Sequence, residues 1–211
     1  MVVNTKSRIL HVSEILFQQI LAVFILLIFW EIFKSYNFSQ KPAWHIILCV
    51  AGFALFLAEG VQVYRKESIV SFGETRKDKI KVHGIIMVTG FICMSIGIIL
   101  KISQKEDSNL AHFTTVHGKL GLSAWILAFV ASIGGAISAQ FSFAEKTATI
   151  RLVHLLVGVI AYLLGIINIG YGLKYLDVGD NGKIFLIVLL SIYVCYSFMG
   201  PLLSVKNYFK K

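Results

Sequence analysis

Four of the six histidines in this sequence recur at nearly equal intervals along the chain. They are His45, His83, His117 and His154, and each stands at the start of a long apolar run. The intervals of 38, 34 and 37 residues each correspond to about one membrane span plus one connection. Because successive spans run in opposite directions, His45 and His117 are expected at one face of a membrane, and His83 and His154 at the other.

Two neutral imidazoles at one depth on facing helices are the ligands that a six-coordinate haem iron needs. The pattern therefore predicts two haem b groups, one held by His45 and His117 and one by His83 and His154, with the irons roughly 20 Å apart. With both axial positions taken, the iron has no open site for oxygen, which favours electron transfer. A single histidine at a helix end is more often interfacial, but matching positions in four consecutive spans indicate a function.

The elements that carry these histidines are membrane spans. The chain has 211 residues, is 57% hydrophobic and has a mean hydropathy of +0.78, too apolar for a soluble domain of this size. We expect an all-α integral membrane protein with six transmembrane helices, in which helices two to five form a central four-helix bundle around two b-type haems. The spans are placed near residues 15–33, 44–63, 83–101, 118–140, 152–173 and 184–204.

The chain is expected to form a single domain over residues 1–211, with its core at about 42–203, because no connection is long enough to form a soluble appendage. The first apolar segment is followed by Glu31 and Lys34 and by no small-residue cleavage motif. We therefore expect it to be retained as helix one rather than removed as a signal peptide.

Three cysteines, Cys49, Cys93 and Cys195, lie inside apolar runs and form no CxxC pair. This argues against a disulfide framework, a zinc site or an iron–sulfur cluster, and predicts buried, reduced thiols that pack as small hydrophobic groups. The formal net charge is +9, but the basic residues fall in the connections between spans. No nucleic-acid partner is expected from that distribution.

The basic residues predict the orientation of the chain. With six spans, both termini share a face with the connections between spans two and three and between spans four and five. Thirteen lysines and arginines are counted on that face and six on the other. This positive excess predicts that both termini are cytoplasmic.

Several glycines lie close to the histidines in the sequence. They are Gly84, Gly118 and Gly158, with Gly90, Gly97 and Gly121 further along the same spans. Each could leave room for a flat macrocycle, or could allow two helices to pack closely, and the sequence favours neither explanation.

Residues 42–203 resemble the cytochrome b561 family, in particular its short domain-containing branch of ascorbate-dependent transmembrane reductases. The resemblance rests on WH at 44–45, Glu59, the basic run before His83, AHFTTVHGKLG at 111–121 and His154. It implies electron transfer from cytosolic ascorbate through an inner haem on His83 and His154. An outer haem on His45 and His117 would then pass the electrons to monodehydroascorbate or a ferric chelate. It also implies a multi-pass protein of an endomembrane, such as the endoplasmic reticulum or a vesicle, and a homodimer.

Two motifs depart from the better-studied family members that regenerate ascorbate. Only VYRK at 63–66 remains of a longer motif after helix two, and Gly118 and Lys119 stand where those members have Ser and Trp. The departures place the chain nearer the domain-containing branch and leave the outer acceptor open.

Cations near the inner ligands are candidates for binding the ascorbate anion. They are Lys77, Lys79, Lys81 and Arg151. Their alternative role is to set topology and bind lipid head groups.

Three further ionisable residues are candidates at the two faces. His112, five residues before His117, could bind the outer acceptor or pass a proton, or it could be an ordinary exposed loop residue. Lys119 could pair with a haem propionate or snorkel to lipid phosphate. Glu59 could take up a proton, or pair with Arg65 or Lys66.

Two other functions are consistent with parts of the pattern. A haem-bearing membrane anchor of a quinone-linked dehydrogenase would use the same histidines, with a partner subunit supplying or removing the electrons. A divalent-metal carrier would need acidic residues near the middle of the membrane, and helices three to six contain none there.

Overall fold

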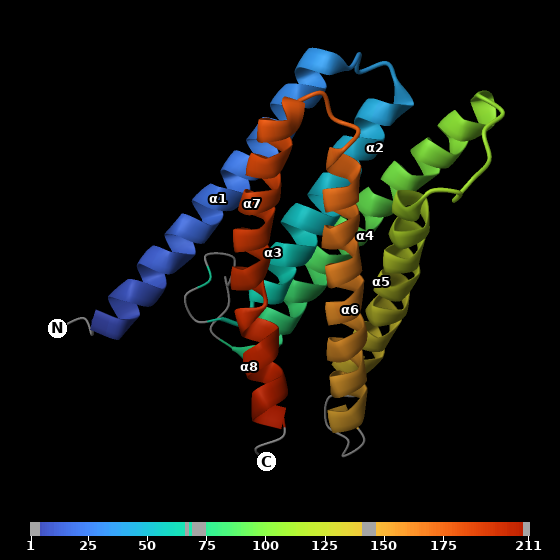
Figure 1. The fold of residues 1–211 in the computed structure, drawn as a ribbon. Coiled ribbons are helices and arrows are strands. Elements are labelled where there is room, and N and C mark those ends of the chain that lie inside the picture. The colour runs from blue at the N-terminus through green and yellow to red at the C-terminus, as the bar shows by residue number, and fades with distance from the viewer. Residues whose placement is uncertain (1–4, 66–67, 69–74, 141–146, 209–211) are drawn as a thin grey trace.

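In the computed structural model, every regular element among the described residues is helical (Figure 1). The structure describes residues 5–65, 68, 75–140 and 147–208. The helices are α1 (Thr5–Ser35), α2 (Lys41–Val50), η1 (Ala51–Phe56), α3 (Leu57–Gln62), α4 (Arg76–Asp107), α5 (Val116–Gln140), α6 (Thr147–Leu173), α7 (Gly179–Ser197) and α8 (Met199–Tyr208). Of the basic residues counted on the terminus face, Lys66, Lys146, Lys210 and Lys211 lie outside the described residues.

Six helices are long and apolar enough to cross a membrane, which confirms the predicted fold class. The second consists of α2, η1 and α3 in continuous succession, and η1 is a π-helical segment. The helices extend beyond the predicted spans, since α4 covers 76–107 instead of 83–101 and α1 begins at Thr5 instead of residue 15. Hydropathy marks only the part inside the hydrocarbon, about 30 Å thick, whereas polar turns continue the helix on either side.

Local sequence determines where two histidine-bearing helices begin. Pro42 occupies the first turn of α2, where its missing N–H removes no helical hydrogen bond. Thr75 caps α4, because its side-chain oxygen accepts a hydrogen bond from the backbone N–H of Asp78 at 3.2 Å. These starts place His45 four residues, and His83 seven residues, after the first residue of its helix.

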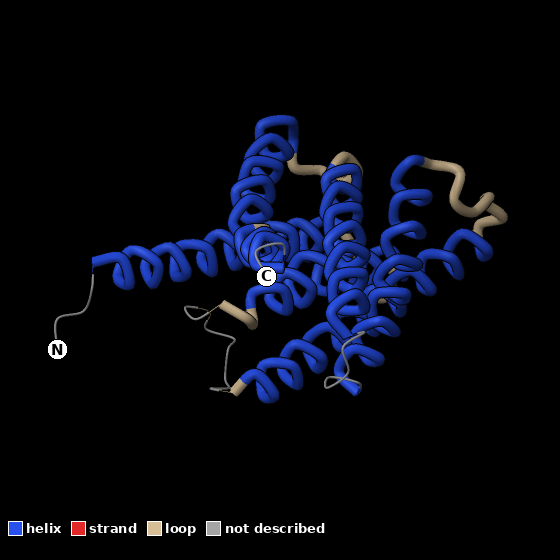
Figure 2. Tube along the Cα trace, turned by 90° about the horizontal axis from the view of Figure 1, so that it is seen from below, coloured by secondary structure: helices blue, strands red, loops and turns tan. Residues whose placement is uncertain are grey.

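The helices pack in neighbouring antiparallel pairs. Helix α5 lies against α6, α2 and η1 lie against α4, and α1 packs on α7. Seen from below, α1 extends out of the bundle towards the N-terminus (Figure 2). Towards its N-terminus α1 leans away from the other helices, and the two described chain ends lie at the same end of the bundle (Figure 1). Helices α1 and α7 thus lie beside the four helices that carry the histidines.

Two glycines near the histidines serve close packing between α4 and the second span. A Cβ at Gly90 would lie 2.7 Å from the Phe56 Cβ, and one at Gly97 would lie 2.9 Å from the Cys49 Sγ. Gly84 has open space instead, with no atom within 4 Å of an added Cβ. Close helix packing therefore accounts for Gly90 and Gly97, whereas Gly84 packs against no neighbouring helix.

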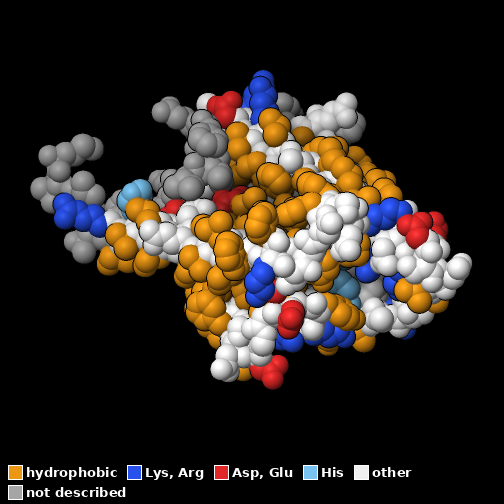
Figure 3. Space-filling model, turned by 90° about the horizontal axis from the view of Figure 1, so that it is seen from above, with side chains coloured by type: hydrophobic (Ala, Val, Ile, Leu, Met, Phe, Trp, Pro, Cys, Tyr) orange, Lys and Arg blue, Asp and Glu red, His pale blue; other side chains and the backbone are white. Residues whose placement is uncertain are grey.

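The outer surface of the bundle is apolar, as a lipid-facing surface requires. Large hydrophobic side chains such as Ile85, Ile99 and Phe33 are more than 60% exposed. Viewed from the end that carries the 36–40, 108–115 and 174–178 connections, charged side chains are scattered among the hydrophobic ones (Figure 3). All three cysteines are free thiols, but Cys49 and Cys93 are only half-buried and Cys195 is exposed. The predicted burial is therefore wrong, because a thiol on a membrane span can face the apolar outer surface as well as the interior.

Candidate functional site

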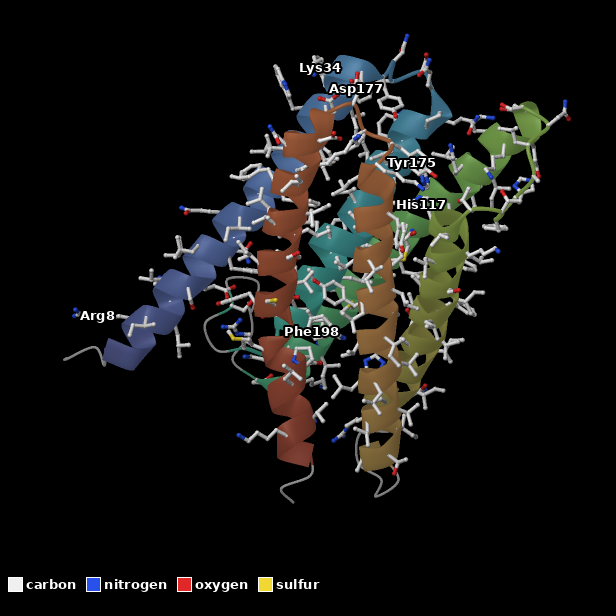
Figure 4. The ribbon with its side chains drawn as sticks, in the orientation of Figure 1. Arg8, Lys34, His117, Tyr175, Asp177 and Phe198 are labelled. Atoms are coloured by element: carbon white, nitrogen blue, oxygen red, sulfur yellow. The ribbon has the colours of Figure 1, made fainter. Side chains whose placement is uncertain are left out.

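The four histidines lie in two pairs at opposite ends of the bundle. His45 on α2 faces His117 on α5, with ring centroids 6.2 Å apart and ring planes at 89°. His83 on α4 faces His154 on α6, also at 6.2 Å, with planes at 87°. We call them the upper pair (His45, His117) and the lower pair (His83, His154), after the view in which His117 is labelled near the upper end (Figure 4).

A backbone carbonyl of a neighbouring helix orients each imidazole. The Nδ1–O distances are 2.9 Å for His45 and Gly97, 2.8 Å for His83 and Gly60, 3.1 Å for His117 and Asn168, and 2.8 Å for His154 and Ala131. A carbonyl only accepts hydrogen bonds, so Nδ1 must carry the proton in every case. Each Nε2 therefore keeps its free electron pair, which is the arrangement typical of a metal-binding histidine.

The bonds are reciprocal within each antiparallel helix pair. On α4, α5 and α6, the carbonyl that orients the partner's histidine comes fourteen residues after that helix's own histidine. In the second span the same interval, from His45 to Gly60, is fifteen residues. The extra residue falls where η1 lies, and a π-helical segment is the way in which a helix absorbs one inserted residue.

The spacing of the rings fits a metal centre between them. Two metal–nitrogen bonds of about 2 Å, plus roughly 1.1 Å from each nitrogen to its ring centre, separate two coaxial imidazoles by about 6.2 Å. Both pairs have this separation. Glycines also lie against the rings, since a Cβ at Gly135 would lie 2.9 Å from the His154 Cε1 and one at Gly172 would lie 3.2 Å from the His117 Cε1. No sequence pattern marks these two glycines, because each contacts a histidine of another helix.

A cavity of about 480 Å³ surrounds the upper pair. Apart from the two imidazoles, its lining is mostly apolar, as in cofactor pockets generally. Its charged and titratable lining comes from the upper ends of the helices and the 108–115 connection, namely Lys101, Lys105, His112, Tyr36 and Tyr175. Sequence reasoning missed Lys101 and Lys105, because they lie at the far end of α4 from His83.

The 108–115 connection folds back against this cavity. Asn109 and Phe113 adopt positive φ angles of 52° and 53°, and the Lys105 ammonium donates to the Ala111 carbonyl at 2.7 Å. The His112 Nε2 lies 3.8 Å from Glu106, and its side chain is about one third exposed. Lys119 is exposed on α5 and is absent from the cavity lining.

The lower pair lies among aromatic and basic side chains. The Tyr64 ring centroid is 5.3 Å from that of His83. Partial burial raises the pKa of the Tyr64 phenol, while the nearby charges of Arg76 and Arg151 act in the opposite direction. Two arginines from different helices therefore lie near the phenol that contacts His83.

The basic candidates for the lower face lie in the first turns of two helices. Lys77 and Lys81 are exposed on α4, Lys79 is half-buried there, and Arg151 is half-buried on α6. These turns also carry the two histidines of the lower pair, so the four cations lie at its end of the bundle.

Glu59 is not paired with Arg65, one of the two partners that the sequence suggests, and its partner is Gln18. It is buried and accepts a hydrogen bond from Gln18 at 3.2 Å. Arg65 instead lies 4.0 Å from Glu14, and Lys66 is outside the described residues. Glu14 lies one residue before the predicted start of the first span at residue 15, so the sequence does not indicate it as a partner of Arg65.

Comparisons with known proteins agree with this arrangement. A family model described as eukaryotic cytochrome b561 matches residues 44–178, which include all four histidines. The human transmembrane reductase CYB561D2 is 29% identical over 129 residues, covering 60% of this chain and 58% of that protein. The bovine protein of the same name matches equally, and the mouse probable transmembrane reductase CYB561D1 is 24% identical over 137 residues.

The matched region spans only 58% of the length of these relatives. The family model, however, covers well over half of this chain and encloses both imidazole pairs. Membership of a b-type cytochrome family implies that the chain binds haem b, which the ring spacing and the free Nε2 atoms fit. The chain belongs to the eukaryotic cytochrome b561 family.

Proposed function

We propose that this chain is a transmembrane oxidoreductase that carries electrons through two haem b groups from cytosolic ascorbate to monodehydroascorbate or a ferric chelate. The observation that supports the proposal best is the presence of two like imidazole pairs at different depths. On α5, His117 of the upper pair and Ala131, which orients His154 of the lower pair, are fourteen residues apart. At about 1.5 Å per residue this places the pairs about 21 Å apart along the helix, a large part of the membrane.

His83 and His154 would hold the inner haem, and His45 and His117 the outer one. When bound, each haem would supply a one-electron carrier held by the two imidazoles of its pair. The chain's own contribution is to keep each Nε2 unprotonated through the Nδ1–carbonyl bonds. The surrounding apolar helices exclude water from the path between the two sites.

At the lower end, Lys77, Lys79, Lys81 and Arg151 would attract the ascorbate anion to the inner site. Arg151 and Lys79 are half-buried, so their charges are less screened by solvent than those of Lys77 and Lys81. Tyr64, in contact with His83, would mark the point where the donor approaches.

At the upper end, Lys101 and Lys105 line the cavity and would contact the haem propionates or an anionic acceptor at its edge. Lys119, on the same turn of α5 as His117, is a further candidate for a propionate. His112, in the connection that borders the cavity, would contact the outer acceptor. Both kinds of contact pair a cation or an imidazole with an oxygen anion.

The proposal includes an orientation and a setting. Both termini would face the cytosol, because the excess of basic residues lies at their end. The whole chain, residues 1–211, would form one six-helix domain in an endomembrane, as a homodimer.

The test is to purify the protein in detergent, measure haem per chain and add ascorbate. We expect two haems per chain, both reduced by ascorbate, and electron delivery to a ferric chelate. One haem per chain would overturn the proposed path. Two haems that ascorbate fails to reduce, together with a co-purifying flavin or iron–sulfur subunit, would favour the membrane-anchor function.

A further inference from the structure

A group of polar side chains is buried inside the membrane region where α1, α3 and α7 meet. Glu14 and Gln62 are 0% exposed, and Glu59 is 6% exposed. Helices α1 and α7 carry none of the four histidines, so haem ligation does not account for charges at this place. Burying ionisable groups in a membrane is costly, and they are generally retained for a function.

Glu14 is well compensated within this group. The Arg65 guanidinium lies 4.0 Å from its carboxylate and donates to the Tyr196 hydroxyl at 2.8 Å. The Tyr196 hydroxyl in turn donates to the Glu14 Oε2 at 2.9 Å. Glu14 therefore has both a counter-charge and a hydrogen-bond donor.

Glu59 lacks that compensation. Its Oε2 accepts from the Gln18 Nε2 at 3.2 Å, and the same amide reaches the Glu14 Oε1 at 3.4 Å. Among the described residues, the Glu59 Oε1 and the Gln62 Nε2 have no hydrogen-bond partner although both are buried. The described part of this group thus holds one guanidinium for two carboxyl groups. An ionised Glu59 is therefore balanced only while a further positive charge lies nearby, and without that charge it must take up a proton.

The other titratable groups around Glu59 are engaged elsewhere. From α7 the Tyr193 hydroxyl donates to the Ala54 carbonyl at 2.6 Å, and from α6 the Tyr162 hydroxyl lies 2.9 Å from the Ser197 Oγ. From α4, His83 is bonded to the backbone of α3. With Glu14 paired to Arg65, Glu59 is the group of this cluster that is free to gain or lose a proton.

The backbone connects Glu59 to the lower pair. Gly60, the next residue on α3, provides the carbonyl that accepts the His83 Nδ1 proton at 2.8 Å. An electron that arrives at the lower site adds a negative charge within a region of low dielectric, where charges act on each other strongly. A carboxylate one residue away from the carbonyl that orients the histidine is well placed to offset that charge by binding a proton.

We propose that Glu59 is a redox-linked proton site of the lower haem centre, which rests on the proposed function. Glu59 binds one proton for each electron that enters the lower site, forming an O–H bond at Oε1, and releases it when the electron leaves. The electron comes from the ascorbate-type donor and the proton from water at the terminus end. The net charge of the site therefore stays nearly the same when it is reduced.

The test is a redox titration of the purified haem-loaded protein at several pH values, with electrochemical mediators and without ascorbate. Because a proton is taken up on reduction, the midpoint potential of the lower site should fall as pH rises. The limit is about 59 mV for each tenfold change in proton concentration. We expect Glu59→Gln to abolish this dependence while both haems remain bound.

Glu31→Gln is the matched control. Glu31, on α1, is a buried carboxyl group like Glu59, but it lies at the upper end of the bundle and is paired with Lys34 at 3.1 Å. It should keep the wild-type dependence. Gln18→Leu removes the hydrogen-bond donor that stabilises the ionised Glu59. The pH range over which the midpoint potential changes should therefore move to higher pH. This variant keeps the test valid if Glu59→Gln fails to fold.

Infrared difference spectra between the oxidised and reduced protein give a second readout. A carboxylic acid C=O band should grow on reduction and be missing in Glu59→Gln. A pH-independent potential in a wild-type protein with both haems bound would overturn the proton site, as would a dependence unchanged in Glu59→Gln. Failure to bind two haems, or failure of ascorbate to reduce them, would instead contradict the proposed function.

Discussion

The Nδ1 of His83 on α4 lies 2.8 Å from the carbonyl oxygen of Gly60 on α3. This bond sets the tautomer and the orientation of the imidazole at once, because a carbonyl can only accept the Nδ1 proton. It also makes the site depend on the position of a neighbouring helix. The same dependence applies to the other three histidines, which bond to Gly97, Asn168 and Ala131.

The pairing of the histidines predicts which single replacements will remove the same haem. We expect His83→Leu and His154→Leu to remove the same haem component from the spectrum, and His45→Leu and His117→Leu to remove the other, because each haem needs both ligands. Redox difference spectra and haem content measure this, with a fall to about one haem per chain.

His11→Leu is the control for these replacements, since His11 is exposed on α1, and it should retain both haems. If the His83 and His154 variants lost different components, the pairing would be wrong.

The fifteen-residue interval in the second span predicts an asymmetry between two deletions. Deleting Leu55 from η1 should restore the fourteen-residue interval of the other helices, so both haems should be retained. Deleting Ile92 from α4 turns Gly97 by about 100° relative to His83, and the carbonyl then no longer faces His45. We expect that deletion to reduce binding of the upper haem. Haem content and absorption spectra of the two purified variants provide the comparison, and equal losses would contradict the role given to η1.

Gly135 is predicted to be required for the lower site. A Cβ there would lie 2.9 Å from the His154 Cε1, so Gly135→Ala should push the ring away from the Ala131 carbonyl. Overpacking of this kind costs about 1–3 kcal/mol, which corresponds to a roughly five- to hundredfold weaker hold on the haem. The measurement is haem loss from the purified variant over time.

Gly170→Ala on α6 is the matched control, because no atom lies within 4 Å of an added Cβ. It should behave like the wild type. Equal haem loss in the two variants would show that the helices, rather than the His154 ring, are sensitive to the added methyl group.

The cavity around the upper pair predicts which lysine acts on an anionic acceptor. Lys101 lines the cavity and is half-buried, whereas Lys119 is exposed outside the lining. Lys101→Gln should raise the KM for ferricyanide about three- to tenfold, equivalent to roughly 0.7–1.4 kcal/mol. Lys119→Gln should change it less, because solvent screens an exposed charge. Steady-state rates at low and high salt test this, and a larger effect at Lys119 would assign the acceptor contact to α5.

Much of this protein is determined by its sequence. The six helices follow from apolar runs long enough to cross a bilayer, since a helix satisfies the backbone hydrogen bonds of such a segment within itself, as lipid requires. The alternation of His45, His83, His117 and His154 between faces follows from the same spacing. Helix direction reverses with each span, so residues near the starts of alternate spans lie at the same end.

The tertiary structure alone decided what orients these histidines and what lies beside them. The carbonyls of Gly60 and Gly97 have no sequence signature, because any residue carries a carbonyl and only the rotation of one helix against another selects which one is used. The partner of Arg65 likewise depended on where α1 lies. Glu14 is more than fifty residues away in sequence, and only the packing of α1 against α7 brings it to the end of α3.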